Sequence, residues 1–331
     1  MTRTVARLAA LSVWILCAVP SSAFAQLTCP DYGSVANPPA LQGPTRRSFR
    51  HTGSQLLSWT HPPYHMVHDQ IVPVGTQATV VGKFDYGGVL HKDLEDEDVH
   101  VYIMGTNAPG WQYVGEFRTD SDGKIYVPIT RPVGEYRVTM IVEGDLSSAT
   151  GFLSVVEPGR QTVLFDIDGT LTLNDFEAVG DYLGCSTAQA YAHAVDVVNS
   201  YAAKGYQIIY LTARPYWVGK DTREWIDYQG LVDGHVHTNP YGDGPIPPNT
   251  EQYKTDYLTY LLEDVGLDIV RVYGNATTDI GAYEAAGLPK SETYIIGEHA
   301  GVDGTMPIRN DYLQHLLSVV ASTPDADCIP R

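Results

Sequence analysis

The chain has 331 residues, of which 44% are hydrophobic and 10% aromatic, so it is long enough for two globular domains and too apolar for an extended disordered protein. Its 39 acidic residues outnumber its 21 basic residues, which gives a formal net charge of −18 at pH 7. At long range this charge repels nucleic acid and anionic membranes, so we expect no nucleic-acid partner.

Residues 1–25 predict a secretory signal peptide. Arg3 and Arg7 precede an apolar run over residues 8–20, and small residues at 23–25 form a cleavage site before Gln26. The alternative is an N-terminal membrane anchor, but the run is roughly a dozen residues and a bilayer span needs roughly 20. We therefore expect an exported protein, periplasmic or secreted, with no transmembrane segment in the mature chain.

Three cysteines follow the predicted signal peptide: Cys29, Cys185 and Cys328. In an exported protein this odd set is most simply one disulfide and one free thiol. A bridge between Cys29 and Cys328 would hold the two ends of the mature chain, and we expect this pairing. Spacing alone leaves Cys185 as an alternative partner.

The next part of the chain predicts an irregular lead-in over residues 26–65, followed by a β-sandwich over residues 66–158. The lead-in is rich in Pro, Ser, Thr and Gly without sustained periodicity. The second stretch has short β-rich runs separated by turn residues, which is typical of an immunoglobulin-like sandwich. Within it, the turn at residues 120–123 predicts a hairpin.

Two polar features of this stretch suggest metal sites only weakly. The acidic run from Asp93 to Asp98 lacks the glycine and the ligand spacing of a calcium loop, so we interpret it as a solvated loop. His61, His65 and His68 have no acidic or cysteine partner at a defined spacing, so we interpret them as surface or packing residues.

Residues 160–325 predict a doubly wound α/β domain with a parallel sheet. Buried β-runs at 162–165, 206–211, 269–273 and 293–296 alternate with helical stretches, the first of them over residues 186–204. In such sheets the ligand lies at the carboxyl ends of the strands. Polar motifs follow these strands, so we expect the functional site there.

The first motif is Asp-Ile-Asp-Gly-Thr at residues 166–170. Asp166 and Asp168 follow a buried strand and can face one cavity, where a divalent cation makes their mutual repulsion tolerable. Gly169 allows a sharp turn, and Thr170 supplies a hydroxyl near a phosphate. An aspartate pair alone is common in loops, but the whole string at a strand end is specific.

Three further motifs have weaker signals when each is taken alone. Thr212 ends an apolar strand, although threonine is a common residue there, and Lys254 would ordinarily be a solvated helix residue. Asn275 and Asp279 follow the third strand with a spacing that suits one metal ion. Residues 275–277 also form a glycosylation sequon, which is the less specific interpretation.

In this order the four motifs resemble the haloacid dehalogenase superfamily of phosphohydrolases. The resemblance implies that Asp166 attacks phosphorus and that Asp168 protonates the leaving oxygen and then activates water. Thr212 and Lys254 would hold the transferring phosphoryl group. The remaining implied roles are phosphate binding by Gly169, Thr170, Ala213 and Arg214, and Mg²⁺ binding by Asp166, the carbonyl of Asp168, and Asn275 or Asp279.

The resemblance extends to both predicted domains. Strings at 83–87, 98–104, 134–144, 205–215 and 273–297 look like the C-terminal region of the membrane-associated phosphatidylinositol transfer proteins, which is similar in turn to the catalytic part of lipins, magnesium-dependent phosphatidate phosphatases. The resemblance implies that the transfer-protein version lacks the first aspartate and binds phosphatidate without cleaving it. Asp166 is present in this chain, so its residue set fits catalysis.

We therefore expect a magnesium-dependent phosphomonoester hydrolase, with phosphatidate at a membrane surface as its substrate. Fewer than forty residues separate Asp166 from the end of the next predicted helix, which leaves no room for a large cap domain. An open site suits a membrane-bound phosphoester, whereas the net charge opposes approach to anionic lipid. Two alternatives remain: a catalytically silent phosphatidate-binding module, and a phosphatase of a small soluble phosphate.

Overall fold

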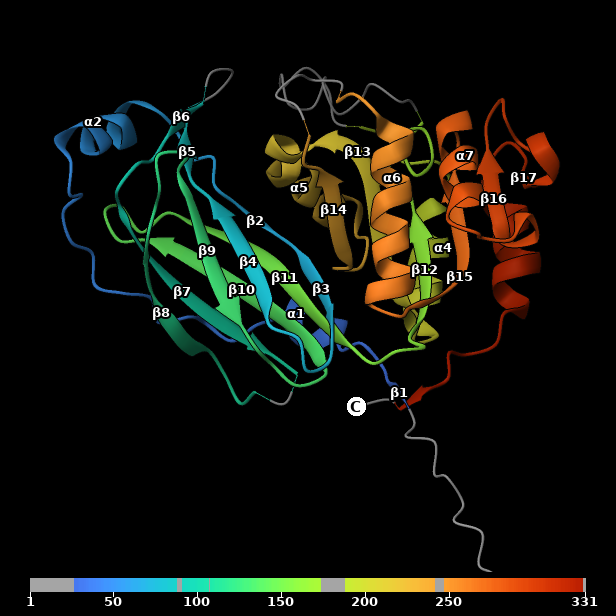
Figure 1. The fold of residues 1–331 in the computed structure, drawn as a ribbon, viewed down its shortest axis with the longest axis horizontal. Helices are drawn as coiled ribbons and strands as arrows, with labels where there is room; N and C mark the ends of the chain where they lie inside the picture. Colours follow the sequence, from blue (N-terminus) through green and yellow to red (C-terminus); the bar gives the residue numbers. More distant parts are fainter. Residues whose placement is uncertain (1–26, 88–90, 107, 174–187, 242–246, 330–331) are drawn as a thin grey trace, which may run out of the picture.

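The computed structural model of the protein describes residues 27–87, 91–106, 108–173, 188–241 and 247–329. These residues form a β-sandwich and, beside it, an α/β unit built on a parallel sheet (Figure 1). The predicted signal peptide and Cys185 lie outside the described residues.

The sandwich consists of one five-stranded sheet, in the order β3-β11-β10-β7-β8, and one three-stranded sheet, in the order β2-β4-β9. A short ribbon pairs β5 with β6. The bounds are β2 (Met66–His68), β3 (Gln70–Pro73), β4 (Ala78–Lys83), β5 (Asp85–Tyr86), β6 (Lys92–Asp93), β7 (Asp98–Gly105), β8 (Gln112–Arg118), β9 (Lys124–Ile129), β10 (Gly134–Val142) and β11 (Ser148–Val156).

Alternating apolar residues of the two sheets form the sandwich core. Val99 and Val101 of β7 and Val138 and Met140 of β10 are fully buried, and they pack against residues of the smaller sheet such as Val80. Successive side chains of a strand point to opposite faces, so this spacing places one row of each strand in the core. The predicted β-sandwich is confirmed at this level.

The turn at residues 120–123 forms, but the predicted hairpin is wrong. Gly123 donates its backbone N–H to the carbonyl oxygen of Asp120 at 3.1 Å and has a positive φ of 64°. However, β8 pairs with β7 in one sheet and β9 pairs with β4 in the other. The turn therefore carries the chain from one sheet of the sandwich to the other.

The acidic run before β7 is not a fully solvated loop. Glu97 is buried, and its carboxylate accepts hydrogen bonds from the backbone N–H groups of Arg50 at 2.8 Å and His51 at 3.0 Å. The predicted solvation is therefore wrong at Glu97, whose carboxylate anchors part of the lead-in.

The α/β unit has one six-stranded parallel sheet in the order β14-β13-β12-β15-β16-β17. The strands are β12 (Gln161–Phe165), β13 (Gln207–Pro215), β14 (His235–Asn239), β15 (Asp268–Gly274), β16 (Thr293–Ile296) and β17 (Met306–Ile308). The α-helices among the described residues of this unit are α4 (Ala194–Ala203), α5 (Gly219–Gln229), α6 (Thr250–Thr259), α7 (Thr277–Ala285) and α8 (Leu313–His315). Helical segments of other types are Tyr216–Val218, Tyr260–Asp264, Lys290–Glu292, Val302–Gly304 and Leu316–Val320.

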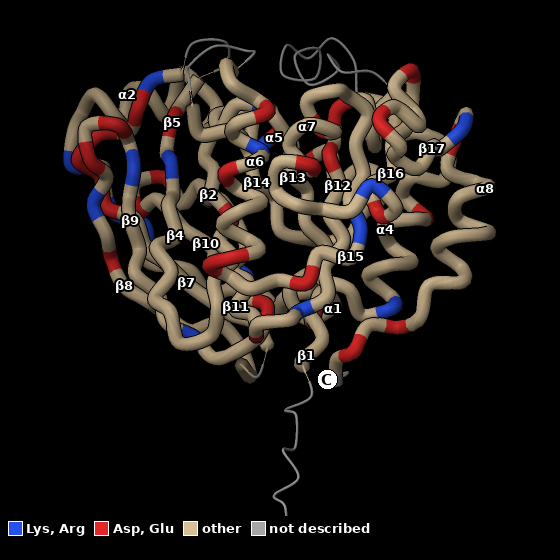
Figure 2. The backbone as a smooth tube through the Cα atoms, turned by 45° about the vertical axis from the view of Figure 1, so that its right-hand side comes forward, with Lys and Arg blue, Asp and Glu red and all other residues tan. Residues whose placement is uncertain are grey.

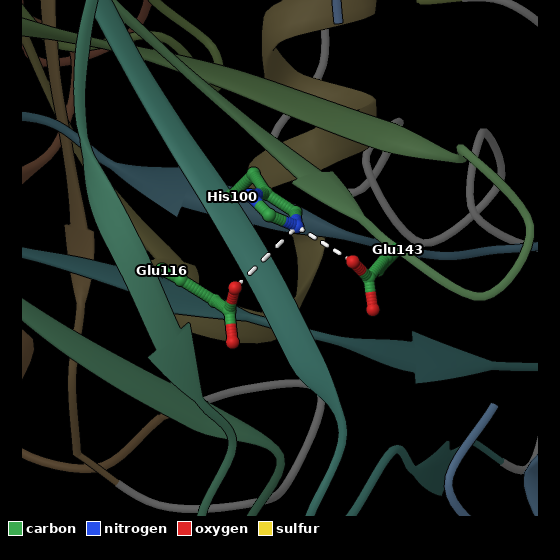
Figure 3. A group of neighbouring side chains, drawn as sticks. All are labelled: His100, Glu116 and Glu143. Carbon is green, nitrogen blue, oxygen red and sulfur yellow. Dashed lines mark hydrogen bonds and ion pairs between the residues drawn. The ribbon is translucent and has the colours of Figure 1, made fainter. Parts of the chain in front are cut away.

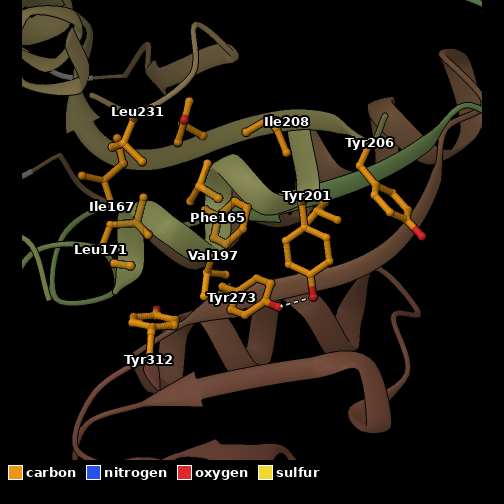
Figure 4. Close-up of a cluster of buried hydrophobic side chains, with 14 of the residues drawn as sticks. Phe165, Ile167, Leu171, Val197, Tyr201, Tyr206, Ile208, Leu231, Tyr273 and Tyr312 are labelled. Carbon is orange, nitrogen blue, oxygen red and sulfur yellow. Dashed lines mark hydrogen bonds between the residues drawn. The ribbon is translucent and has the colours of Figure 1, made fainter. Parts of the chain in front are cut away.

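Both faces of the parallel sheet are covered. Val163 and Phe165 of β12 belong to one apolar cluster, which includes residues of α4, α5 and the C-terminal helices (Figure 4). Leu164 belongs to a second cluster with residues of α6 and α7. Continuous apolar strands are therefore buried on both faces, as the sequence pattern predicts.

The predicted helical stretch over residues 186–204 is shorter in its described part. Helix α4 begins at Ala194, and residues 188–193 are not helical and include an isolated bridge between Thr172 and Ala190. His193, directly before the helix, has a positive φ of 64°, which is not a helical conformation. Residues 186–187 lie outside the described residues.

The lead-in contains more structure than predicted. It forms β1 (Leu27–Thr28), α1 (Tyr32–Ala36) and α2 (Thr52–Thr60). Strand β1 pairs in parallel with β18 (Cys328–Ile329), and a disulfide joins Cys29 to Cys328, as expected. Tyr32 is buried in the α/β unit, where its hydroxyl accepts the backbone N–H of Ile208 at 2.6 Å.

A buried carboxylate joins the two units. Asp69, between β2 and β3, accepts the backbone N–H groups of Phe152 in β11 and Val236 in β14, each at 2.8 Å. It also pairs with Arg223 of α5. Strands of both units therefore share one hydrogen-bonding partner, which fixes the sandwich against the edge of the parallel sheet.

A second buried acid lies at this interface. Ser154 Oγ donates to Glu135 Oε2 at 2.6 Å, and Gln207 of β13 donates to Ser154 Oγ at 3.4 Å. Burial raises the pKa of Glu135 to about 7, although the hydrogen bond from Ser154 and the charge of Arg160 oppose this shift.

Candidate active site

The site is built where the strand order reverses. Strand β12 lies between β13 and β15, and the chain leaves it in one direction to β13 and later returns to β15 on its other side. Side chains that follow these three strands therefore meet at one edge of the sheet. Asp166, Arg214 and Asn275 all lie at this edge.

Asp166 is buried directly after β12. Its backbone N–H donates to the carbonyl oxygen of Tyr273 in β15 at 3.0 Å, which continues the sheet by one residue. Its carboxylate accepts a hydrogen bond from Lys254 Nζ at Oδ1, at 2.7 Å, and from Thr170 Oγ1 at Oδ2, at 2.9 Å. Both oxygens are thus oriented by residues of the predicted motifs.

Lys254 is a buried residue of α6, not a solvated one. Its ammonium group also donates to Asp279 Oδ1 at 2.6 Å, so it lies between two buried carboxylates. Asp279 Oδ2 accepts the backbone N–H groups of Asn275 and Ala276, each at 3.0 Å, at the start of α7. Both oxygens of Asp279 are engaged, so its carboxylate orients Lys254 and the loop that carries Asn275.

Gly274 leaves room for this arrangement. A Cβ atom at this position would lie 2.7 Å from Cβ and 2.8 Å from Oδ2 of Asp279. Any other residue would displace a buried carboxylate. Close packing against Asp279 therefore requires glycine at position 274.

The buried charges shift each other's ionisation. Burial raises the pKa of Asp166 to about 7; Lys254 opposes this shift, and Asp279 and Asp168 add to it. Burial disfavours the ammonium form of Lys254, but the carboxylates of Asp166 and Asp279 outweigh it and raise the pKa of Lys254 above its ordinary value. Lys254 is therefore a fixed positive charge beside Asp166.

Asp168 is held by the strand next to Asp166. Thr212 Oγ1 donates to Asp168 Oδ2 at 3.0 Å. Arg214 donates through Nε and Nη2 to both carboxylate oxygens, with distances between 2.9 and 3.1 Å. Arg214 Nη1 lies 3.2 Å from Thr222 Oγ1 in α5. In this structure Thr212 and Arg214 thus contact Asp168, and Ala213 lies between them in β13.

The turn after Asp168 brings Thr170 back toward Asp166. Gly169 has a positive φ of 72°, which glycine adopts without strain, and its N–H donates to Thr172 Oγ1 at 3.0 Å. Thr170 Oγ1 lies 2.9 Å from Asp166 Oδ2 and 3.3 Å from Asn275 Oδ1. This hydroxyl therefore marks the point where the first and last motifs meet.

The donor set at this point fits a hard cation. Carboxylate and amide oxygens are the ligands that Mg²⁺ prefers, and Asp166 Oδ2 and Asn275 Oδ1 both face the Thr170 hydroxyl. Asp279 is oriented instead toward Lys254 and the backbone of α7. Of the two candidate ligands Asn275 and Asp279, the geometry thus favours Asn275.

Two contributions to the site have no clear sequence signal. Thr222 lies inside α5 and contacts Arg214, yet a threonine in a helix follows no motif. The helix-capping role of Asp279 is likewise hidden, because its spacing from Asn275 equally suits a metal loop. The capping pattern of an acid at the third helical position is the only sequence feature that points to it.

Two segments of the chain match known domain families. Residues 163–297 match the family described as "PITM 1-3, LNS2 domain", and residues 63–155 match "PITM 1-3, beta-sandwich domain". These matches support a relationship of this chain to the PITM/LNS2 family. The first matched segment along the chain covers the β-sandwich, and the second covers most of the α/β unit, including the candidate site.

Curated relatives agree with these matches. Membrane-associated phosphatidylinositol transfer protein 1 of Rattus norvegicus is 33% identical over 266 residues, which cover 78% of this chain and 20% of the relative. Membrane-associated phosphatidylinositol transfer protein 3 of Homo sapiens is 30% identical over 265 residues, which cover 78% of this chain and 26% of the relative. The chain thus spans about a fifth to a quarter of the length of these relatives.

A solved structure titled "Phospho-Aspartyl Intermediate Analogue of Phosphoserine phosphatase" aligns with 49% of this chain and 98% of its own chain. It is 14% identical to this chain, with a TM-score of 0.33.

The comparisons correct the expected localisation. The relatives are named as membrane-associated phosphatidylinositol transfer proteins, so the prediction of a periplasmic or secreted protein is wrong, and the export signal has no support. No helix of the described residues is both long and apolar enough to span a bilayer.

Proposed function

We propose that this chain is a magnesium-dependent phosphomonoester hydrolase that acts on phosphatidate through an aspartyl phosphate on Asp166. The observation that carries the proposal is the setting of Asp166, a buried carboxylate at a strand end, 2.7 Å from Lys254 Nζ and 2.9 Å from Thr170 Oγ1. A reactive carboxylate held beside a fixed cation suits attack on a phosphate dianion. The proposal includes a haloacid-dehalogenase-like, doubly wound fold for residues 160–325, preceded by the sandwich at 66–158.

In the first step the Asp166 carboxylate attacks phosphorus and the bond to the ester oxygen breaks. The leaving oxygen takes a proton from Asp168. An ammonium group has three N–H donors, two of which point at Asp166 and Asp279. The third would donate to a phosphoryl oxygen. Bound at Asp166, the Asp168 carbonyl and Asn275, Mg²⁺ would supply neutralisation of the phosphoryl charge.

In the second step water attacks the phosphorus of the aspartyl phosphate. Asp168 takes the proton from this water, the bond between phosphorus and Asp166 breaks, and inorganic phosphate leaves. To exchange protons, Asp168 must give up one of its contacts with Arg214 or Thr212. Because Arg214 contacts both carboxylate oxygens, loss of one contact leaves the others to hold Asp168 in position.

The substrate class rests on the relatives. They are named for phosphatidylinositol transfer and for membrane association, which supports a glycerophospholipid. The phosphate monoester follows instead from the chemistry proposed for Asp166, which selects phosphatidate within this class. Acidic residues are distributed over both units (Figure 2), so long-range repulsion from an anionic bilayer opposes this choice. Within a Debye length of roughly 8 Å at physiological salt, however, Lys254, Arg214 and Mg²⁺ act on the phosphate directly, whereas the charges of distant carboxylates are screened.

One observation favours a second function, a silent phosphatidate-binding module. Both oxygens of Asp168 already accept hydrogen bonds, so a ligand could bind without proton transfer. Phosphate release from phosphatidate in mixed micelles with Mg²⁺, compared with soluble phosphomonoesters, separates the possibilities. Release from phosphatidate is the expected result. Binding without release would identify the silent module, and release from soluble esters alone would identify a soluble-phosphate phosphatase.

The Asp166→Asn variant is the control for this assay. It removes the attacking carboxylate but keeps the size of the side chain, so phosphate release should fall by several orders of magnitude while the fold survives. A variant that retains most of the wild-type turnover would show that Asp166 is not the nucleophile.

A further inference from the structure

A histidine and two glutamates meet on the five-stranded sheet of the sandwich. His100 of β7 lies directly opposite Glu116 of β8 in the strand register. Glu143 follows β10 and lies two residues beyond Ile141, which is opposite His100. Side chains of one strand alternate between faces, so this register places all three on the face opposite to Val99 and Val101. Figure 3 shows the three side chains pointing toward one another.

The distances suit one small ion. His100 Nε2 lies 3.1 Å from Glu143 Oε1 and 4.0 Å from Glu116 Oε2, and these three atoms lie within 4.8 Å of one another. In a tetrahedral zinc site with bonds of 2.0–2.2 Å, neighbouring ligand atoms are about 3.4 Å apart. The His100–Glu143 separation of 3.1 Å is close to this value, and the His100–Glu116 separation of 4.0 Å is larger. Glu116, with 46% of its side chain exposed, has room to move toward the other two ligands.

The imidazole is already oriented for such a role. His100 Nδ1 lies 3.0 Å from the hydroxyl of Tyr113, which leaves Nε2 facing the two carboxylates. Histidine ligands usually have their second ring nitrogen held by a hydrogen bond, which fixes the ring and tunes its basicity. His100 and Glu143 are both buried, so two of the three groups are also fixed by packing.

The negative charge of Glu116 and Glu143 favours binding of a further cation beside His100. Two carboxylates face one imidazole nitrogen, and Arg47 Nη1, 3.2 Å from Glu143 Oε1, can balance only one of them. The side chain of Arg47 is 70% exposed and able to move away, and Glu143 also has a second oxygen. A divalent ion would neutralise both carboxylates together.

We propose that His100, Glu116 and Glu143 form a binding site for a divalent transition-metal ion of the zinc class. Imidazole nitrogen is a borderline ligand that suits Zn²⁺, whereas Mg²⁺ prefers oxygen donors alone. The site is therefore chemically distinct from the proposed magnesium site of the α/β unit. Three protein ligands leave a fourth position for water beside the exposed Glu116.

The test measures Zn²⁺ on the full chain after chelator treatment and dialysis against Zn²⁺. Wild type should hold one more equivalent of zinc than His100→Gln, and Asp166→Asn should hold one more than the double variant Asp166→Asn/His100→Gln. Co²⁺ in place of Zn²⁺ should show tetrahedral visible absorption that His100→Gln and Glu116→Gln both lose. Because the assay does not use phosphatase activity, its failure is distinguishable from failure of the proposed function.

Two further variants separate ligation from a structural effect. Tyr113→Phe keeps all three ligands and should weaken zinc binding about 10–100-fold. His51→Gln removes an exposed histidine side chain that pairs with Asp96, and this variant should bind zinc like wild type. Zinc should also raise the melting temperature of wild type but not of His100→Gln. Equal zinc content and affinity in wild type and His100→Gln, or no zinc uptake by wild type, would overturn the proposal.

Discussion

Arg214 donates hydrogen bonds to both carboxylate oxygens of Asp168, through Nε at 3.1 and 2.9 Å and through Nη2 at 2.9 Å. A planar guanidinium matches a carboxylate in this geometry, and a lysine ammonium does not. Arg214, in the motif on the neighbouring strand β13, therefore fixes the orientation of the candidate acid/base Asp168.

Arg214→Lys should therefore lower kcat more than it raises KM. Loss of the bidentate contact leaves Asp168 free to turn, and a misplacement of this kind costs about 10²-fold in rate. Thr222→Val, which removes only the hydroxyl beside Arg214 Nη1, should lower kcat less. Steady-state kinetics on one substrate give both constants, with the exposed Arg309→Lys as control. A rise in KM alone would instead assign Arg214 to phosphate binding.

Lys254→Met should destabilise the protein strongly in the absence of metal. The change leaves the buried carboxylates of Asp166 and Asp279 without their shared cation, and breaking a buried pair in this way costs about 3–5 kcal/mol. The exposed neighbour Gln252→Met on the same helix should change stability by less than about 0.5 kcal/mol. Urea unfolding measures both. Adding Asp166→Asn to Lys254→Met should recover part of the loss, and no recovery would contradict the assigned pairing.

The raised pKa of Glu135 predicts that the free energy of unfolding depends on pH. Its pKa is raised from 4.5 to about 7 by burial, so the folded state holds a proton that the unfolded chain has lost between these pH values. The stability that Glu135 contributes is complete below pH 4.5 and is lost as the pH rises through 7.

Replacement with glutamine removes this dependence. The free energy of unfolding of Glu135→Gln relative to wild type should therefore rise between pH 4.5 and 7 by on the order of 3 kcal/mol and then level off. Urea titrations at several pH values measure the difference. The exposed Glu263→Gln should show a flat difference over the same range. A flat profile for Glu135→Gln would mean that the acid is ionised in the folded protein.

The double change Cys29→Ser and Cys328→Ser should lower the free energy of unfolding by about 2–4 kcal/mol, because the bridge closes a loop between residues 299 positions apart. Thermal melts with and without reductant check this. Reductant should destabilise wild type and have no effect on the double variant. An equal melting temperature for oxidised wild type and the double variant would show that the bridge adds no stability.

The sequence predicts the parts of the site that depend on strand ends. Asp166 and Asn275 each follow a buried strand, and parallel strands with one order reversal must bring their carboxyl ends together. The apolar pattern predicts that Thr212 ends its strand, but β13 continues to Pro215, so Thr212 lies three residues before the strand end. The sequence does not predict the burial of Lys254 as directly. The residues around a lysine on a helix do not show whether its face of the helix is covered. Only the joint occurrence with the other motifs indicates it.

Other features depend on tertiary pairing that local patterns do not contain. The turn at residues 120–123 has hairpin chemistry, yet the choice of β7 and β4 as the partners of β8 and β9 is made by the sandwich. The bidentate contact between Arg214 and Asp168 likewise requires side chains of neighbouring strands to adopt matching rotamers. The prediction of export was wrong for another reason. It rested on the short apolar run over residues 8–20, and such a run alone does not determine where a protein is located.

The bridge between Cys29 and Cys328 makes the chain between them a covalent ring. A protease that cuts this ring once cannot release a fragment, because both new pieces remain attached through the sulfur atoms. The nicked protein would migrate as one band on a gel without reductant and as two bands with it. Digestion followed only under oxidising conditions would therefore make an internally cleaved molecule look intact.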